Sequence, residues 1–144
     1  MNESNKYYLD ELKEEQKIIY RLLENTKDSV QRGNVHDIAS HIGLLKNGFT
    51  AHIKKADKIY GDLLKTVEEK SIKMVAITID AFSAAMKGIG ERVVKFFDKY
   101  PDKDEIARLT MEFNRDFENV CEDIMKRVNN EEKVLYPMYE KHCC

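Results

Sequence analysis

The chain has 144 residues, 42% of them hydrophobic, which suits a single domain over residues 1–144 with a core large enough to fold alone. Its 24 Lys and Arg residues nearly balance 26 Asp and Glu residues, for a net charge of −2. The composition therefore provides no basic field for nucleic acid or an anionic membrane, and we expect neither as a partner.

The sequence also indicates a compartment. It contains no run of about eighteen apolar residues, and its first stretch, MNESNKYYLDELKEEQ, lacks the apolar core of a signal peptide. Three cysteines without a CxxC pair do not make a disulfide framework. We therefore expect a cytoplasmic protein with reduced thiols.

Apolar residues recur at steps of three, four or seven over residues 8–30, which predicts a first helix that ends at Gly33. Asn34, followed three residues later by Asp37, resembles a capping box and predicts the start of a second helix. The apolar stripe of this second helix runs over residues 38–63.

A polar stretch at residues 65–70 predicts a break, and the apolar stripe of a third helix follows over residues 72–100. The motif YPDKDE then ends that helix, because proline cannot continue the hydrogen-bond ladder. Asp102 with Glu105 predicts a new N-terminal cap, and a fourth stripe runs over residues 106–135.

This pattern predicts the fold class. Long amphipathic helices joined by short turns favour an all-α, up-down-up-down antiparallel four-helix bundle, because short connections force neighbouring helices to run antiparallel. Strand signals are absent. Glycines inside helices cost roughly 1 kcal/mol each relative to alanine, so we expect a close backbone approach or a bend at some of them. They are Gly43, Gly48, Gly61, Gly88 and Gly90.

Polar residues on the apolar stripes are the candidates for a functional site, since bundles build cofactor sites in their interiors. Gln16 and His52 fall on the first and second stripes, and Arg127 and Glu131 lie at the edge of the fourth. Counting residues outward from the predicted turns places Gln16, His52 and Asp80 in one layer. The same count places Arg127 and Glu131 one to two turns along.

Each candidate also has a simpler interpretation. A lone histidine on an apolar stripe is more often a hydrogen-bonded core residue than a metal ligand. Arg127 and Glu131, four residues apart, would by default form a surface pair that stabilises a helix by a few tenths of a kcal/mol. Glu132 would by default be solvated, and Pro137 would simply close the last helix.

Three segments resemble the hemerythrin-type HHE bundles: LKEEQKIIYRLLE, LLKNGFTAHIKKADKIYGDLL and RVNNEEKVLYP. The most specific part is the ending, two acids followed by two residues, leucine, an aromatic residue and proline. In that family such acids follow a ligand histidine. The resemblance implies a four-helix bundle whose histidines and carboxylates hold a non-haem di-iron centre that binds dioxygen or senses oxygen, nitric oxide or iron.

The chain departs from the pattern of that family at several expected ligands. Gln16 stands at the first-helix histidine, Ala56 at a second-helix glutamate and Arg127 at the fourth-helix histidine, while the third helix has no histidine. A guanidinium group cannot bind a metal ion as a ligand. We therefore expect a degenerate metal site without a cofactor. The remaining candidate ligands are His52, Glu131, Glu132, Asp57 and Asp80.

Three functional hypotheses follow. The first is a hemerythrin-like bundle that has lost most of its iron ligands and acts, without enzymatic activity, as a sensing or protein-interaction module. The second is a metal-binding hemerythrin-type protein that uses iron in oxygen, nitric oxide or iron sensing, or in storage. The third is a regulatory adaptor that resembles anti-sigma bundles and binds a protein partner through its surface.

The last residues, His142, Cys143 and Cys144, carry imidazole and thiol groups that suit a soft metal such as zinc or copper(I). Terminal residues beyond a helix-ending proline are usually poorly held. We expect a loosely held tail here, whose deletion leaves the melting temperature nearly unchanged.

Overall fold

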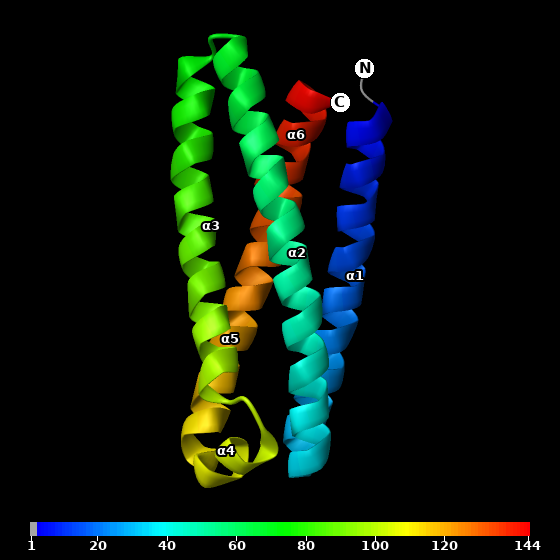
Figure 1. The fold of residues 1–144 in the computed structure, drawn as a ribbon, viewed down its shortest axis with the longest axis vertical. Coiled ribbons are helices and arrows are strands. Elements are labelled where there is room, and N and C mark those ends of the chain that lie inside the picture. The colour runs from blue at the N-terminus through cyan, green and yellow to red at the C-terminus, as the bar shows by residue number, and fades with distance from the viewer. Residues whose placement is uncertain (1–2) are drawn as a thin grey trace.

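The structure, a computed structural model, describes residues 3–144, and all secondary structure in that range is helical, which confirms the all-α class. Figure 1 shows three long helices side by side, with the last part of the chain passing behind them. No helix within residues 3–144 is both long and apolar enough to cross a membrane. The elements are α1 (Glu3–Arg32), α2 (Val35–Glu69), α3 (Lys73–Lys99), α4 (Lys103–Arg108), α5 (Thr110–Asn130), the π-helical segment η1 (Glu131–Leu135) and α6 (Tyr136–Cys143).

Two of the predicted helix boundaries are confirmed by their capping contacts. Gly33 has a φ of 78°, a left-handed conformation that glycine adopts without a steric penalty, and it separates α1 from α2. The backbone N–H of Asp37 donates to Asn34 Oδ1 at 3.2 Å. In the same way the N–H of Glu105 donates to Asp102 Oδ1 at 3.0 Å at the start of α4. Each carboxyl or amide oxygen satisfies a backbone donor that the helix leaves free.

The turn between α2 and α3 lies later in the chain than predicted. Residues 65–69 continue α2 as regular helix, and the chain reverses at Ser71, which has a φ of 58°. Val67 is fully buried, so packing keeps this polar stretch helical although its sequence suggests a break. The break predicted at residues 65–70 exists, but it begins only at Lys70, so its predicted position is too early.

The predicted fourth helix is divided into several elements. Leu109, with a φ of −116°, separates α4 from α5. Beyond α5 the helix widens into η1 and continues as α6, so Pro137 does not end it. Proline is tolerated here because it lies at the start of α6, directly after the widened turn of η1.

The C-terminal residues are held against α1 and α2, so the prediction of a loosely held tail is wrong. Asn5 Nδ2 donates to the carbonyl of Cys143 at 2.8 Å, and Lys70 Nζ donates to the carbonyl of His142 at 3.1 Å. The thiol of Cys143 lies 3.6 Å from Thr66 Oγ1. Within the described chain, His142 and Cys143 are thus tied to the N-terminal end of α1 and the C-terminal end of α2.

The apolar interior consists of two clusters. One contains Ile19, Leu23, Phe49, Val93 and Val128, together with the aromatic residues Phe96, Phe97, Tyr100, Phe113 and Phe117. The other contains Leu9, Leu12, Ile59, Leu63, Met86, Leu135, Tyr136 and Tyr139. On α1 and α2, and between Val128 and Leu135, the position between the two clusters is occupied by a buried polar residue of the layer described next.

Candidate functional site

A buried polar layer, made of Gln16, His52, Arg127 and Glu131, lies between the two apolar clusters. Each of these side chains is at most 2% exposed. They come from α1, α2, α5 and η1, so the layer joins elements that are distant in the sequence. Charged groups in such a position are stable only when they are paired and hydrogen-bonded.

Glu131 is the centre of this layer. Its Oε1 accepts hydrogen bonds from Gln16 Nε2 at 3.0 Å and from His52 Nε2 at 2.8 Å, while its Oε2 lies 3.4 Å from Arg127 Nε. The amide of Gln16 also donates to the carbonyl of Val128 at 3.3 Å. Three donors therefore compensate one fully buried carboxylate, and the carboxylate in turn fixes the side chains of three helices.

His52 faces a carboxylate on each side of its ring. Its Nδ1 lies 3.1 Å from Glu15 Oε1, its Nε2 contacts Glu131, and Glu15 also pairs with Lys55. Both ring nitrogens can donate only in the imidazolium form. Burial alone would lower the pKa of His52, but its hydrogen bonds to Glu131 and Glu15 and their negative charges outweigh this and raise the pKa. The layer therefore favours a charged His52.

We expect the stability of the protein to fall as the pH rises above neutrality because of His52. Its folded-state pKa lies above the ordinary histidine value of 6.5, so its stabilising contribution is complete below that pH and is lost as the pH rises through the folded-state pKa. Denaturant unfolding at a series of pH values measures the effect. His52→Gln should remove this dependence, while substitution of the exposed His36 should keep it. An unchanged pH profile in His52→Gln contradicts the assignment.

Arg127 reaches from α5 to the backbone of α3. Its Nη1 donates to the carbonyl of Met86 at 3.0 Å, and its Nη2 lies 3.7 Å from Asp57 Oδ1. Gly90 makes room for it, since a Cβ at this position would lie 2.7 Å from Nη1. The side chain is 1% exposed, so the interpretation of Arg127 and Glu131 as an ordinary surface pair is wrong.

Gly90→Ala should destabilise the protein, although alanine is the better helix former. The added Cβ would force a guanidinium that is anchored to Met86 and Glu131 to move, which we expect to cost about 1–3 kcal/mol. Gly88→Ala is the matched control, because the nearest atom to its Cβ is 4.0 Å away. There the helix propensity should dominate and stabilise by about 1 kcal/mol or less. Equal effects in thermal or denaturant unfolding would contradict the close contact with Arg127.

The π-helical segment η1 begins at Glu131, and the N–H of Tyr136 donates to the Glu131 carbonyl five residues earlier. In a regular α-helix, Pro137 would clash with the carbonyl of Lys133, and a wider turn before the proline relieves such a clash. Glu131 is buried at the start of this turn, whereas Glu132 is exposed. The two adjacent acids therefore have different roles, and only the first belongs to the polar layer.

Two buried tyrosines border the layer. Burial, and next to it the negative charge of Glu131, raises the pKa of Tyr60 and of Tyr136 far above the ordinary value of a phenol. Within the described chain neither hydroxyl has a hydrogen-bond partner. Both phenols remain neutral, so the charge of the layer is set by its acids, His52 and Arg127.

The other predicted ligands do not join the layer. Asp57, Asp80 and Glu132 are exposed. The placement of Asp80 opposite His52 is wrong because the count assumed a turn centred near residue 66, whereas the chain turns at Ser71. A later turn moves the facing position along α3 by twice the error, to the neighbourhood of Gly90.

The residues present do not fit a di-iron centre. Among residues 3–144, no group of three or more His, Cys, Asp and Glu side chains is arranged to hold a metal ion. Both carboxylate oxygens of Glu131 already face donors, and both ring nitrogens of His52 face carboxylates. The permanent positive charge of Arg127 next to Glu131 would also repel a dication.

Sequence reasoning missed two members of the site. Glu15 is half-buried against His52, and the carbonyl of Met86 accepts a hydrogen bond from Arg127. The position of Glu15, directly before Gln16 on the first apolar stripe, was a signal for partial burial. A backbone carbonyl carries no such signal in a sequence.

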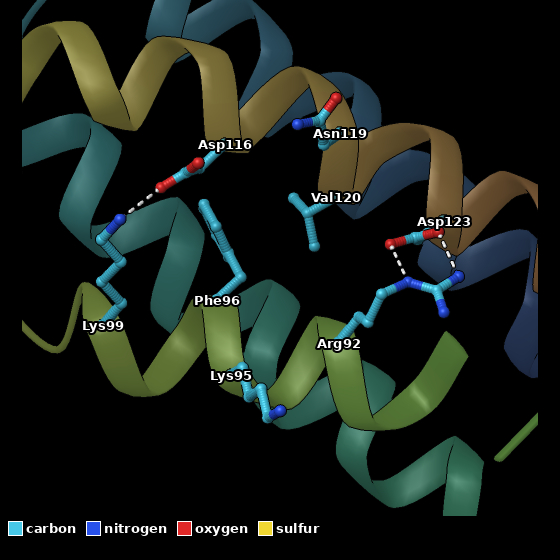
Figure 2. A pocket seen from close by; sticks show the side chains of 8 residues that line it. All are labelled: Arg92, Lys95, Phe96, Lys99, Asp116, Asn119, Val120 and Asp123. Carbon is cyan, nitrogen blue, oxygen red and sulfur yellow. Dashed lines mark hydrogen bonds and ion pairs between the residues drawn. The ribbon is translucent and has the colours of Figure 1, made fainter. Parts of the chain in front are cut away.

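A groove between α3 and α5 is the clearest alternative to the interior layer. It has a volume of about 250 Å³, and its charged groups pair across it (Figure 2). Arg92 Nη2 lies 2.9 Å from Asp123 Oδ1, and Lys99 Nζ lies 2.8 Å from Asp116 Oδ2. Exposed pairs of this kind contribute about 1 kcal/mol or less. The groove is explained by these pairs and needs no ligand.

Comparison with known proteins adds no further evidence. The chain matches no known protein family, no curated protein and no solved structure. The function must therefore be argued from the polar layer and its contacts.

Proposed function

We propose that the chain is a hemerythrin-like bundle in which paired organic groups take the place of iron, and that it acts as a non-enzymatic sensing or protein-interaction module. One observation carries the proposal: the buried carboxylate of Glu131 is compensated by Gln16, His52 and Arg127. A carboxylate that served a metal ion would need another positive partner once that ion was lost.

The departures from the hemerythrin pattern support this interpretation. Gln16 and Arg127 stand where the resemblance implies ligand histidines, and both now bind Glu131 directly. His52, the retained histidine, binds the same carboxylate. The two residues that replace expected ligands thus both contact Glu131, an acid that the chain keeps. This is expected if the interior adapted to the absence of a metal.

The proposed fold of hemerythrin type also implies a helix topology. In Figure 1, α1, α2, α3 and the chain from α5 through η1 to α6 each run along the long axis of the molecule. We infer that they correspond to the up-down-up-down antiparallel bundle of the hemerythrin type. The short helix α4 would then be an insertion at the end of the bundle, before the last long segment.

We also propose that the protein is not an enzyme and that its partner is another protein. The ionised side chains of the layer are paired with one another, with Nη2 of Arg127 left over, and burial raises the pKa of the Cys121 thiol to about 11, which keeps it unreactive. The outer surface is therefore the part of the molecule that would meet a ligand or a cytoplasmic protein partner. Neither nucleic acid nor a membrane is part of the proposal.

Iron analysis tests the proposal directly. Protein purified without chelator from cells grown with iron should contain well under one iron per chain and be colourless, because Arg127 and Gln16 occupy the positions of ligands. The measurement is metal content together with the visible absorption spectrum. Two irons per chain with an oxo-bridge absorption band would overturn the proposal and favour the metal-binding alternative.

A variant with rebuilt ligands serves as the positive control. Gln16→His, Ala56→Glu and Arg127→His together restore three donors that the resemblance implies, while His52 and Glu131 stay in place. We expect this variant, purified in the same way, to bind substantially more iron than the natural chain. If the two proteins bind equally little, the positions do not correspond to a former metal site.

A further inference from the structure

A second groove lies between α2 and α3, on the side of the molecule where Arg127 approaches the surface. Its volume is about 400 Å³, within the range of small-molecule sites. Its walls combine apolar residues with charged residues at the rim. They are Ile53, Asp57, Lys87, Gly90, Glu91, Val94, Lys95 and Arg127.

The inner end of this groove holds an unpartnered donor. Arg127 uses Nε for Glu131 and Nη1 for Met86, but within the described chain its buried Nη2 has no hydrogen-bond partner. The nearest acid is Asp57, whose Oδ1 lies 3.7 Å from Nη2, beyond hydrogen-bonding distance. A buried, charged donor without a partner is costly, so the site favours a group that can accept from Nη2.

The other walls of the groove indicate the chemistry of the rest of the ligand. Ile53, Gly90 and Val94 offer an apolar surface, and Val94 is 38% exposed. Lys87 and Lys95, both exposed, add positive charge at the rim, which the exposed Glu91 offsets in part. We propose that this groove binds a small organic carboxylate, with its head group on Arg127 Nη2 and a short apolar body along Ile53 and Val94.

Asp57 is the natural competitor of such a ligand. Its side chain is 64% exposed and approaches Nη2 without reaching hydrogen-bonding distance. A bound carboxylate would displace it into solvent, where a hydrated aspartate costs little. Asp57 should therefore weaken binding by its negative charge, and removal of that charge should strengthen binding.

This inference is independent of whether the interior ever held iron, since it depends only on the free Nη2 of Arg127 and the groove. The choice of a carboxylate over inorganic phosphate rests on the apolar walls, which phosphate cannot use. The choice over a neutral alcohol rests on the guanidinium, which prefers an anionic acceptor.

An NMR titration at fixed ionic strength tests the proposal with hexanoate as the probe. We expect saturable shifts of the amides of Ile53, Gly90 and Val94, and about two- to fourfold weaker binding for each methylene removed from the chain. Hexanol and inorganic phosphate should bind at least about tenfold more weakly, in line with the loss of one charged contact or of the apolar body.

Substitutions of exposed residues complete the test without risk to the fold. Asp57→Asn should bind hexanoate about two- to fivefold more tightly, and Lys95→Gln about two- to fivefold more weakly. Lys13→Gln, on the exposed surface of α1, is the charge-matched control and should not differ from the natural chain. The proposal is overturned by the absence of saturation, by equal binding of hexanol, or by unchanged affinity in both groove variants.

Discussion

Replacement of Arg127 by methionine is expected to lower the free energy of unfolding by about 3–5 kcal/mol, the cost of removing one partner of a buried ion pair. Methionine keeps an apolar stem, so the loss reports on the guanidinium. Without it, the carboxylate of Glu131 loses its permanent positive partner, and the carbonyl of Met86 loses its side-chain donor. Denaturant unfolding of the variant and the natural chain measures the difference.

Arg92→Met is the matched control for this result. Arg92 also pairs with an acid of α5, Asp123, but its side chain is 55% exposed. Removal of an exposed pair should cost less than about 1 kcal/mol. If Arg127→Met also loses less than about 1 kcal/mol, the Arg127 guanidinium does not serve as the buried counter-charge.

The second large loss of stability is expected at Glu131, the acidic partner of Arg127. Glu131→Gln keeps the shape of the side chain but removes its charge, and leaves Arg127 and a charged His52 close together without a carboxylate between them. We expect a loss of about 3–5 kcal/mol. The pKa of His52 should also fall, because its hydrogen bond to Glu131 and the charge of Glu131 contribute to its elevation.

A double-mutant cycle distinguishes a direct interaction between Arg127 and Glu131 from a general loss of core stability. The variant with both Arg127→Met and Glu131→Gln contains neither buried charge, so it should lose less stability than the sum of the two single losses, by about 1–3 kcal/mol. Additive losses in denaturant unfolding would contradict a direct interaction between Arg127 and Glu131.

Much of the fold could be predicted from the sequence because it depends on local signals. The spacing of apolar residues is enough to identify the helices, and Asn34 and Asp102 mark two helix starts through their own side chains. The same spacing places Gln16 and His52 inside, since each falls between two buried residues of its stripe.

Long-range features could not be predicted in the same way. The turn at Ser71 depends on the packing of Val67, and the resulting shift made Asp80 a wrong partner for His52. The widening of the helix at Glu131 combines the effect of Pro137 with the demand of three donors for one carboxylate. The terminal helix α6 stays ordered because α1 and α2 bind it, which its own composition does not indicate.

The protonation state of His52 is the most direct measure of an interior held together by ion pairs. Nitrogen NMR of the imidazole at neutral pH should show both ring nitrogens protonated, with hydrogens that exchange slowly and signals that vanish in His52→Gln. The two carboxylates that face the ring, from Glu15 and Glu131, favour this state. A neutral ring with one bare nitrogen that shifts when a divalent metal ion is added would contradict the account.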